Sequence, residues 1–169
     1  MSAQRAGHLV RHVGIALMLA GCALTAEAGM ADLINGVKVG APLPPAELHF
    51  LSPPPASSRL RLIDFWATWC EACRESIPAL GALQAKYAAD GLGVIGVTAE
   101  TLDVVQAFQQ KLPTAYATAL DSHPGLNSAL HIRALPYAIM VAADGTIVWR
   151  GQPDEIDDAL LRRLLHPAP

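Results

Sequence analysis

The sequence predicts an α/β domain with a central mixed β-sheet flanked by helices on both faces. Two observations lead to this prediction: strand and helix patterns alternate from residue 59 onward, and an antiparallel hairpin and a helix close the chain. The chain has 169 residues, of which 52% are hydrophobic, so one core can form without a disulfide lattice or a structural metal. With a formal net charge of −3, the composition excludes intrinsic disorder, a basic nucleic-acid binder and a polytopic membrane protein.

Residues 59–169 hold the elements of this domain. Apolar runs predict the strands, Thr101 is placed to cap the second helix, and the turn Asp144-Gly145 joins the last two strands into a hairpin. The strands are expected at Leu60–Ala67, Gly93–Thr98, Tyr116–Leu120, Ala138–Ala143 and Thr146–Arg150. The helices are expected at Cys70–Ala89, Leu102–Leu112, Pro124–Leu130 and Asp154–Leu165. The pattern leaves the order of the strands open.

Residues 29–58 form a leader into the domain. Their many prolines predict extended or turning chain, with room for only short strands near Leu33–Val39 and Ala46–Leu51. We therefore expect residues 22–58 to act as a tether and as an edge of the fold.

The first residues have the features of an export signal. Arg5 and Arg11 precede an apolar run, Val13–Ala20, and no acidic residue lies before it. The run is too short to span a bilayer but suits the hydrophobic region of a signal peptide. We therefore expect residues 1–21 to be removed on export, which places the chain in a compartment where disulfides form and persist.

Two cleavage sites compete at the end of this segment. Leu19-Ala20-Gly21-Cys22 resembles a lipobox, which is cut just before a cysteine that then carries lipid. Ala26-Glu27-Ala28 instead fits ordinary signal cleavage, after which the domain would be soluble in the periplasm. The lipobox accounts for the third cysteine, because three cysteines cannot all pair with one another. It predicts a lipid-modified Cys22 and a membrane anchor.

The most informative stretch joins the first strand of the domain to the following helix through Trp69-Cys70-Glu71-Ala72-Cys73. Two cysteines three residues apart in the first turn of a helix bring their sulfur atoms within bonding distance. Free backbone N–H groups and the helix dipole favour a thiolate on an exposed Cys70, which makes it the attacking sulfur at neutral pH. Cys73 lies further in, is less accessible, and is suited to resolve the mixed disulfide.

Two other roles for the cysteine pair fit the sequence less well. A structural zinc ion would need two more soft ligands, but only His123, His131 and His166 follow Cys73, without ligand-like spacing. A structural disulfide that closes so small a loop would add little stability. Redox chemistry is therefore preferred, and no metal is expected.

Motifs around the cysteine pair and before the hairpin point to a known family. The stretch Phe65-Trp66-Ala67-Thr68-Trp69-Cys70-Glu71-Ala72-Cys73 is followed by Pro78, and Leu135-Pro136 precedes the hairpin. These motifs resemble the thioredoxin superfamily. The export signal and Val39-Gly40-Ala41-Pro42 are similar to the membrane-tethered TlpA/ResA/DsbE group within it, and the resemblance spans about residues 37–166.

The resemblance implies a thioredoxin-like fold, thiol–disulfide exchange with protein clients and no dissociable cofactor. It makes Cys70 the nucleophile, Cys73 the resolving thiol and Pro136 a cis-proline whose loop lies beside the sulfur atoms and binds an extended client backbone. The residues that would border the client are Trp69, Glu71, Ala72, Leu135 and Pro136. Ala72 replaces the proline that is usual there, which leaves the reduction potential open.

Asp64 is the one charged residue in the second half of the apolar strand that leads to the dithiol. Thioredoxin has a buried aspartate at this place that relays a proton for the resolving thiol. The TlpA-like group commonly has a glutamate three residues after the second cysteine instead, where this chain has Ser76, with Glu75 one step earlier. Burial would raise the pKa of Asp64 toward the working pH, as a general base for Cys73 requires. The alternative is that Asp64 only caps or solvates the strand.

These observations predict an exported, membrane-anchored protein disulfide oxidoreductase in the bacterial periplasm. The resemblance implies that it reduces disulfides in protein clients, with cytochrome c apoproteins as one client class, and that a membrane electron donor of the DsbD/CcdA type recharges it. We expect a monomer. One alternative is a disulfide oxidase or isomerase of the same fold. A copper chaperone of the Sco type fits less well, because that group has three residues between its cysteines where this chain has two. A redox-inert docking module conflicts with the intact Cys70/Cys73 pair.

Overall fold

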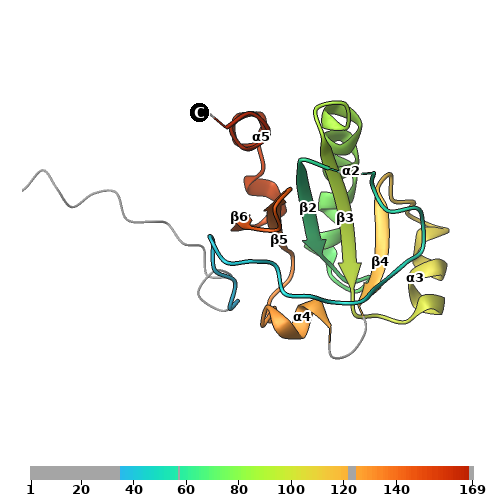
Figure 1. Cartoon of the computed structure of the whole chain (residues 1–169). Helices are drawn as coiled ribbons and strands as arrows, with labels where there is room; N and C mark the ends of the chain where they lie inside the picture. The colour runs from blue at the N-terminus through green and yellow to red at the C-terminus, as the bar shows by residue number, and fades with distance from the viewer. Residues whose placement is uncertain (1–34, 57, 122–124, 168–169) are drawn as a thin grey trace, which may run out of the picture.

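The computed structural model describes residues 35–56, 58–121 and 125–167, and its core is a six-stranded mixed sheet (Figure 1). The strands are β1 (Leu48–Phe50), β2 (Leu60–Phe65), β3 (Leu92–Thr98), β4 (Ala117–Asp121), β5 (Tyr137–Ala142) and β6 (Ile147–Gly151). The helices are α2 (Glu71–Tyr87), α3 (Leu102–Gln109), α4 (Leu126–Ala129), the 3₁₀ turn η1 (Pro153–Glu155) and α5 (Asp158–Leu165). The expected export signal, Cys22 and His123 lie outside the described residues.

The strands lie in the order β1-β4-β3-β2-β5-β6. β2 pairs with β3 and β3 with β4 in parallel, while the β1–β4, β2–β5 and β5–β6 pairs are antiparallel. Because parallel strands end at the same edge of a sheet, the loops that follow β2 and β3 meet there. β5 begins at that edge too, since Tyr137 pairs with Phe65. This edge brings together three segments that are far apart in the sequence.

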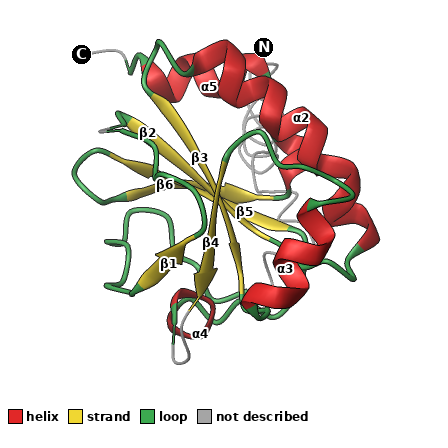
Figure 2. Ribbon diagram, turned by 90° about the vertical axis from the view of Figure 1, so that its right-hand side faces the viewer, coloured by secondary structure: helices red, strands yellow, loops and turns green. Residues whose placement is uncertain are grey.

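One face of the sheet is covered by α2, α3 and α5, which lie along the same side (Figure 2). Leu62 and Met140 point to this face and pack into the same core as the three helices. Ile63 and Phe65 point to the opposite face, where they contact the short helix α4 and leader residues such as Val37. The expected α/β sheet with helices on both faces is confirmed, and helices cover the second face far less than the first.

Helix α2 begins directly after Cys70, which is its N-cap residue. Cys73, Ile77 and Leu80 recur at i, i+4 and i+7 and form the stripe that packs against the sheet. Glu71 in the first turn complements the positive end of the helix dipole. The packing of this stripe fixes Cys73 in the protein interior.

The helix expected over Asp154–Leu165 is not continuous. Ile156 and Asp157 have extended backbone between η1 and α5, and the Asp157 side chain accepts a hydrogen bond from the Leu160 N–H at 2.7 Å. An aspartate that caps a helix N-terminus in this way begins a new helix, because its side chain satisfies a backbone donor that the helix itself cannot.

We expected a short strand near Leu33–Val39, but the described part of this range, residues 35–39, forms no strand. The chain turns at Gly40, whose φ of +87° lies in the left-handed region that favours glycine. Immediately after this turn, Pro42 makes an isolated antiparallel bridge to Thr146. The leader therefore joins the sheet at this bridge and at β1.

Candidate redox site

Cys70 and Cys73 form a disulfide at the N-terminus of α2, with their Cα atoms 5.2 Å apart. The Sγ atom of Cys70 accepts a hydrogen bond from the backbone N–H of Cys73 at 3.2 Å. Cys70 is 7% exposed and Cys73 is completely buried. The order of accessibility agrees with the sequence prediction, although Cys70 is much less exposed in the disulfide than we expected. Of the two cysteines, only Cys70 offers surface to an incoming thiol.

The surface around Cys70 is made by residues that were expected to border a client. Trp69 is 73% exposed, and Glu71 and Ala72 are exposed as well. An exposed tryptophan beside a reactive sulfur offers a large apolar contact, of the kind that dominates many protein interfaces. Trp66, by contrast, is buried in the core, with its ring centroid 5.3 Å from that of Phe108.

Glu100 holds the loop that precedes Cys70. Its carboxylate accepts hydrogen bonds from the Thr68 backbone N–H at 2.6 Å and from the Thr68 hydroxyl at 2.7 Å. It also accepts one from the Thr98 hydroxyl at 3.3 Å. Hydrogen bonds to an ionised carboxylate are stronger than those between neutral groups, so Glu100 fixes the connection from β2 to α2. The sequence around Glu100 does not indicate this role, because the role depends on β2 and β3 ending side by side.

The peptide bond between Leu135 and Pro136 is cis, as expected from the resemblance. Both residues are half-buried and lie just before β5, at the sheet edge where β2 ends. Pro136 lines a groove of about 240 Å³ together with residues of α2 and η1. The lining residues are Ala72, Glu75, Ser76, Ala79, Pro136, Gln152, Pro153 and Asp154. The fold thus places Pro136 beside the first turns of α2.

Asn35 holds the segment that leads to this cis bond. Its buried side chain accepts hydrogen bonds from the backbone N–H groups of Arg133 at 2.6 Å and Ala134 at 3.2 Å. Its amide donates to the Ala134 carbonyl at 3.4 Å. Nothing in the sequence around Asn35 indicated this function, because its partners lie almost 100 residues further along the chain.

Asp64 is completely buried in β2, between Gly96 of β3 and Ala138 of β5. Its side chain points to the face covered by α2, because Ile63 and Phe65 point to the opposite face. Neither carboxylate oxygen has a hydrogen-bond partner among the described residues. Burial raises the pKa of Asp64 from its ordinary value of 3.8 to about 7. A carboxyl group with this pKa can take up and release a proton near neutral pH.

The other two candidate positions for a proton acceptor differ from Asp64 in their surroundings. The Ser76 hydroxyl donates to the Cys73 carbonyl at 2.8 Å, which satisfies a backbone group of α2. Glu75 is exposed and lines the groove beside Pro136. Asp64 is therefore the carboxylate placed in the interior, on the face to which Cys73 also belongs.

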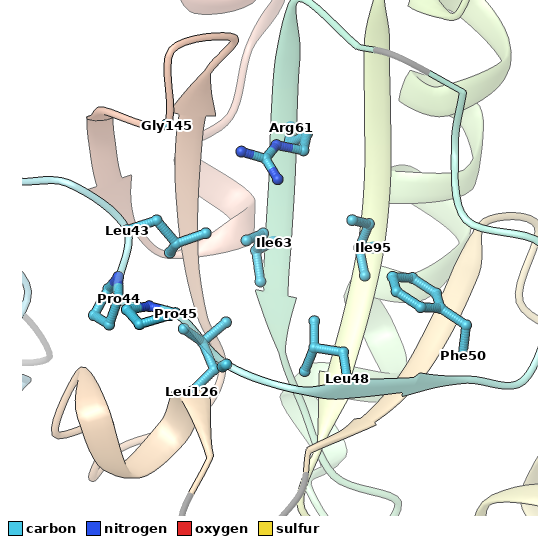
Figure 3. A pocket seen from close by; sticks show the side chains of 11 residues that line it. Leu43, Pro44, Pro45, Leu48, Phe50, Arg61, Ile63, Ile95, Leu126 and Gly145 are labelled. Atoms are coloured by element: carbon cyan, nitrogen blue, oxygen red, sulfur yellow. The ribbon is translucent and has the colours of Figure 1, made fainter.

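A second cavity of about 480 Å³ lies on the opposite face of the sheet, between the leader and strands β2 and β3 (Figure 3). Ile63, Ile95 and Leu48 are among its apolar lining residues, and Arg61 is the charged one. It shares no lining residue with the groove beside Pro136. Two different types of surface therefore lie on the two sides of the sheet.

Within residues 35–56, 58–121 and 125–167, no three His, Cys, Asp or Glu side chains lie together in a way that could hold a metal ion. No helix of that part is both long and apolar enough to cross a membrane.

Two curated proteins are similar to this chain over part of its length. The thiol-disulfide oxidoreductase ResA of Bacillus thuringiensis is 26% identical over 87 residues, which cover 51% of this chain and 50% of ResA. The thiol:disulfide interchange protein HelX of Rhodobacter capsulatus is 28% identical over 122 residues, which cover 70% of this chain and 66% of HelX. The chain therefore spans about half the length of ResA.

The fold and the family follow from two further comparisons. The crystal structure of the thiol:disulfide interchange protein DsbE from Chlorobium tepidum has a TM-score of 0.62 at 22% identity, covering 76% of this chain and 96% of that chain. This match confirms the thioredoxin-like fold, and the expected resemblance to the TlpA/ResA/DsbE group is confirmed as well. The family model described as Redoxin matches residues 56–165, and the chain therefore belongs to the Redoxin family.

Proposed function

We propose that this protein is a thiol–disulfide oxidoreductase that reduces disulfides in protein clients through Cys70 and Cys73. The observation that supports this most directly is the placement of the Cys70–Cys73 disulfide at the N-terminus of α2, beside an exposed Trp69 and the groove at Pro136. A disulfide with one accessible sulfur next to an apolar contact surface suits exchange with a polypeptide. Half of the length of ResA is matched by this chain, so the activity is inferred from the site and the family together.

The reduced enzyme begins the reaction with a thiolate on Cys70. This thiolate attacks one sulfur of the client disulfide, and the other client sulfur leaves and takes up a proton. The enzyme and the client are then joined by a mixed disulfide at Cys70. Cys73 loses its proton and attacks the Cys70 sulfur, which releases the second client sulfur as a thiol. Two electrons have moved from the enzyme dithiol to the client, and the enzyme ends in the disulfide form.

Asp64 accepts the proton of Cys73 in this scheme. A buried carboxylate with a pKa of about 7 is a suitable base near neutral pH, because it is partly ionised and still basic enough to hold a proton. The buried position of Cys73 supports the same role, since solvent has no direct access to it.

Pro136 and its neighbours bind the client. An extended client segment lies along the groove lined by Ala72 and Pro136, and Trp69 contacts its apolar side chains. Glu71 and Leu135 border the same surface. Glu100 and Asn35 act as positioning residues, because each holds one of the two loops that meet at the dithiol.

We further propose that the chain is exported to the bacterial periplasm and anchored by lipid on Cys22, with residues 22–58 as the tether and 59–169 as the folded domain. The alternative is cleavage after Ala28, which would release a soluble periplasmic domain. A membrane electron donor of the DsbD/CcdA type would return the disulfide to the dithiol. Cytochrome c apoproteins are one client class that would fit this setting.

Trapping the client tests the proposal. Cys73→Ser should leave Cys70 in a stable mixed disulfide with the client, which mass spectrometry can identify after purification under non-reducing conditions. Cys70→Ser is the matched control, because it makes the same change of sulfur to oxygen and leaves only the buried thiol. Adducts with Cys73→Ser that are absent with Cys70→Ser are expected. Equal adducts with both variants would contradict the assignment of the nucleophile.

A further inference from the structure

A row of small and polar residues crosses the helix-covered face of the sheet. Ala138, Asp64, Gly96 and Thr118 lie in register on four neighbouring strands, β5, β2, β3 and β4. Residues in register point to the same face of a sheet. Asp64 and Thr118 are thus separated on this face by a residue that has no side chain.

Two buried aromatic side chains border the space over Gly96. A Cβ atom placed on Gly96 would lie 2.9 Å from Trp66 Nε1 and 3.0 Å from Tyr116 Cε2. The glycine therefore lets both rings approach the backbone next to Asp64. Trp66 Nε1 and the Tyr116 hydroxyl are buried and, like the Asp64 carboxylate, lack a hydrogen-bond partner among the described residues. Buried polar groups in a cluster are normally linked by hydrogen bonds, to each other or through water.

The row continues from Thr118 toward the protein surface. The Gln109 side chain on α3 donates to the hydroxyls of Thr118 at 3.0 Å and Thr114 at 2.9 Å, and these hydroxyls are 3.1 Å apart. Gln109, Thr114 and Tyr116 line a surface pocket of about 230 Å³. This pocket shares no lining residue with the groove at Pro136. Polar side chains thus lie between the buried carboxylate and a surface away from the groove proposed for the client, and hydrogen bonds join those of Gln109, Thr114 and Thr118.

We propose that Tyr116 and Thr118 form a proton route between Asp64 and solvent on the α3 side of the sheet, which works while a client covers the dithiol. The inference rests on the proposed role of Asp64 as the base for Cys73. Near pH 7 Asp64 holds a proton in part of the molecules and must release it before it can accept the proton of Cys73. The proton that it then takes from Cys73 leaves by the same route or returns to the Cys73 thiolate when the disulfide is reduced again. The hydroxyls of Tyr116 and Thr118 can each accept one proton and donate another, directly or through water, so the route consumes nothing.

The surroundings of Asp64 suit such a route. Burial, followed by the nearby Asp64 charge, raises the pKa of Tyr116, which keeps its hydroxyl protonated at neutral pH. On this face, α2 contributes Cys73 and, at its far end, Tyr87, while the buried side chains of β3, β5 and α3 are not ionisable. Among the described residues, no positive charge offsets the effect of burial on the pKa of Asp64.

Tyr116→Phe and Thr118→Val test the route in the full chain, because each removes a hydroxyl with little change in shape. Stopped-flow kinetics would follow decay of a mixed disulfide formed between reduced enzyme and a folded protein client, in water and in deuterium oxide. Tyr87→Phe is the control, since it removes another buried hydroxyl near the far end of α2. Asp64→Asn shows separately whether the proposed base operates.

The route predicts that Tyr116→Phe and Thr118→Val each slow decay of the mixed disulfide at pH 7 by about fivefold or more and raise its solvent isotope effect. Tyr87→Phe should decay at the parent rate. Slow decay in Asp64→Asn with parent rates in Tyr116→Phe and Thr118→Val would overturn the route and leave the base in place. A parent rate in Asp64→Asn would overturn both the route and the role of Asp64 as the base. An equal loss in Tyr87→Phe would also overturn the route, because the effect would then be one of packing.

Discussion

Replacing Asp64 by asparagine should remove a large loss of stability that the folded protein suffers as pH rises. Below pH 4, Asp64 is protonated in both the folded and the unfolded chain. Between pH 4 and 7 the unfolded chain releases this proton while the folded chain retains it, because burial raises the pKa of Asp64 from 3.8 to about 7. The native state then binds more protons than the unfolded state, so stability falls with increasing pH.

The size of this effect follows from the shift. About three pH units at roughly 1.4 kcal/mol per unit amount to about 4 kcal/mol, which is fully lost above pH 7. This is a large share of the roughly 5–15 kcal/mol that stabilises an ordinary domain. Retaining a carboxylate at this cost is understandable if it takes part in the reaction.

Urea unfolding of the disulfide form at pH 4, 5, 6, 7 and 8 would measure the effect for the parent and for Asp64→Asn. The unfolding free energy of Asp64→Asn minus that of the parent should increase by about 4 kcal/mol from pH 4 to pH 8. A constant contribution of the buried amide does not affect this change. Asp90→Asn, which removes an exposed carboxylate after α2, serves as the control. A difference that stays constant across pH would refute the assignment of a proton to Asp64 near neutrality.

Four further predictions concern the loops, the thiols and the anchor. Glu100→Gln should lower the unfolding free energy by about 1–2 kcal/mol in urea, because an amide oxygen cannot accept both Thr68 hydrogen bonds with the strength of a carboxylate. Asn35→Ala should cost about 1–3 kcal/mol by the same measurement and reduce client capture, because the N–H groups of Arg133 and Ala134, just before Leu135–Pro136, lose their acceptor. In the reduced protein, Cys70 should be alkylated faster than Cys73 at neutral pH, as measured by mass spectrometry of the labelled peptides, and the reverse order would contradict the assignment of the nucleophile. Cys22→Ser should abolish labelling by fatty acid and release the exported domain from membranes on fractionation, whereas unchanged membrane association would contradict lipid attachment.

The central strands and α2 were predictable because their patterns are local. Apolar runs place β2 and β3 within two residues of the observed ends, and the cysteine spacing places the start of α2. The strand order was not predictable, because pairing between distant strands leaves no local signal in one sequence. The interruption at Asp157 was missed for a different reason: an N-cap residue inside a periodic pattern resembles an ordinary exposed position of one long helix.

The residues of the candidate site likewise fall into those marked by a local motif and those placed by the completed fold. Cys70, Cys73, Pro136 and Asp64 stand in motifs or in a recognisable strand, so their positions could be predicted. Asn35 and Glu100 could not, since hydrogen bonds to residues about 100 and 32 positions away depend on the completed fold.

Equilibration of the Cys70–Cys73 pair with reduced and oxidised glutathione tests the central claim most directly. The fraction of disulfide would be measured across the buffer series by alkylation and mass spectrometry, with Cys73→Ser as the control that cannot form the internal bond. A reductase of protein clients predicts a reduction potential below about −200 mV, in the range of reducing thioredoxin-like proteins. A potential near about −120 mV, typical of strong disulfide oxidants, would contradict the proposed direction of the reaction.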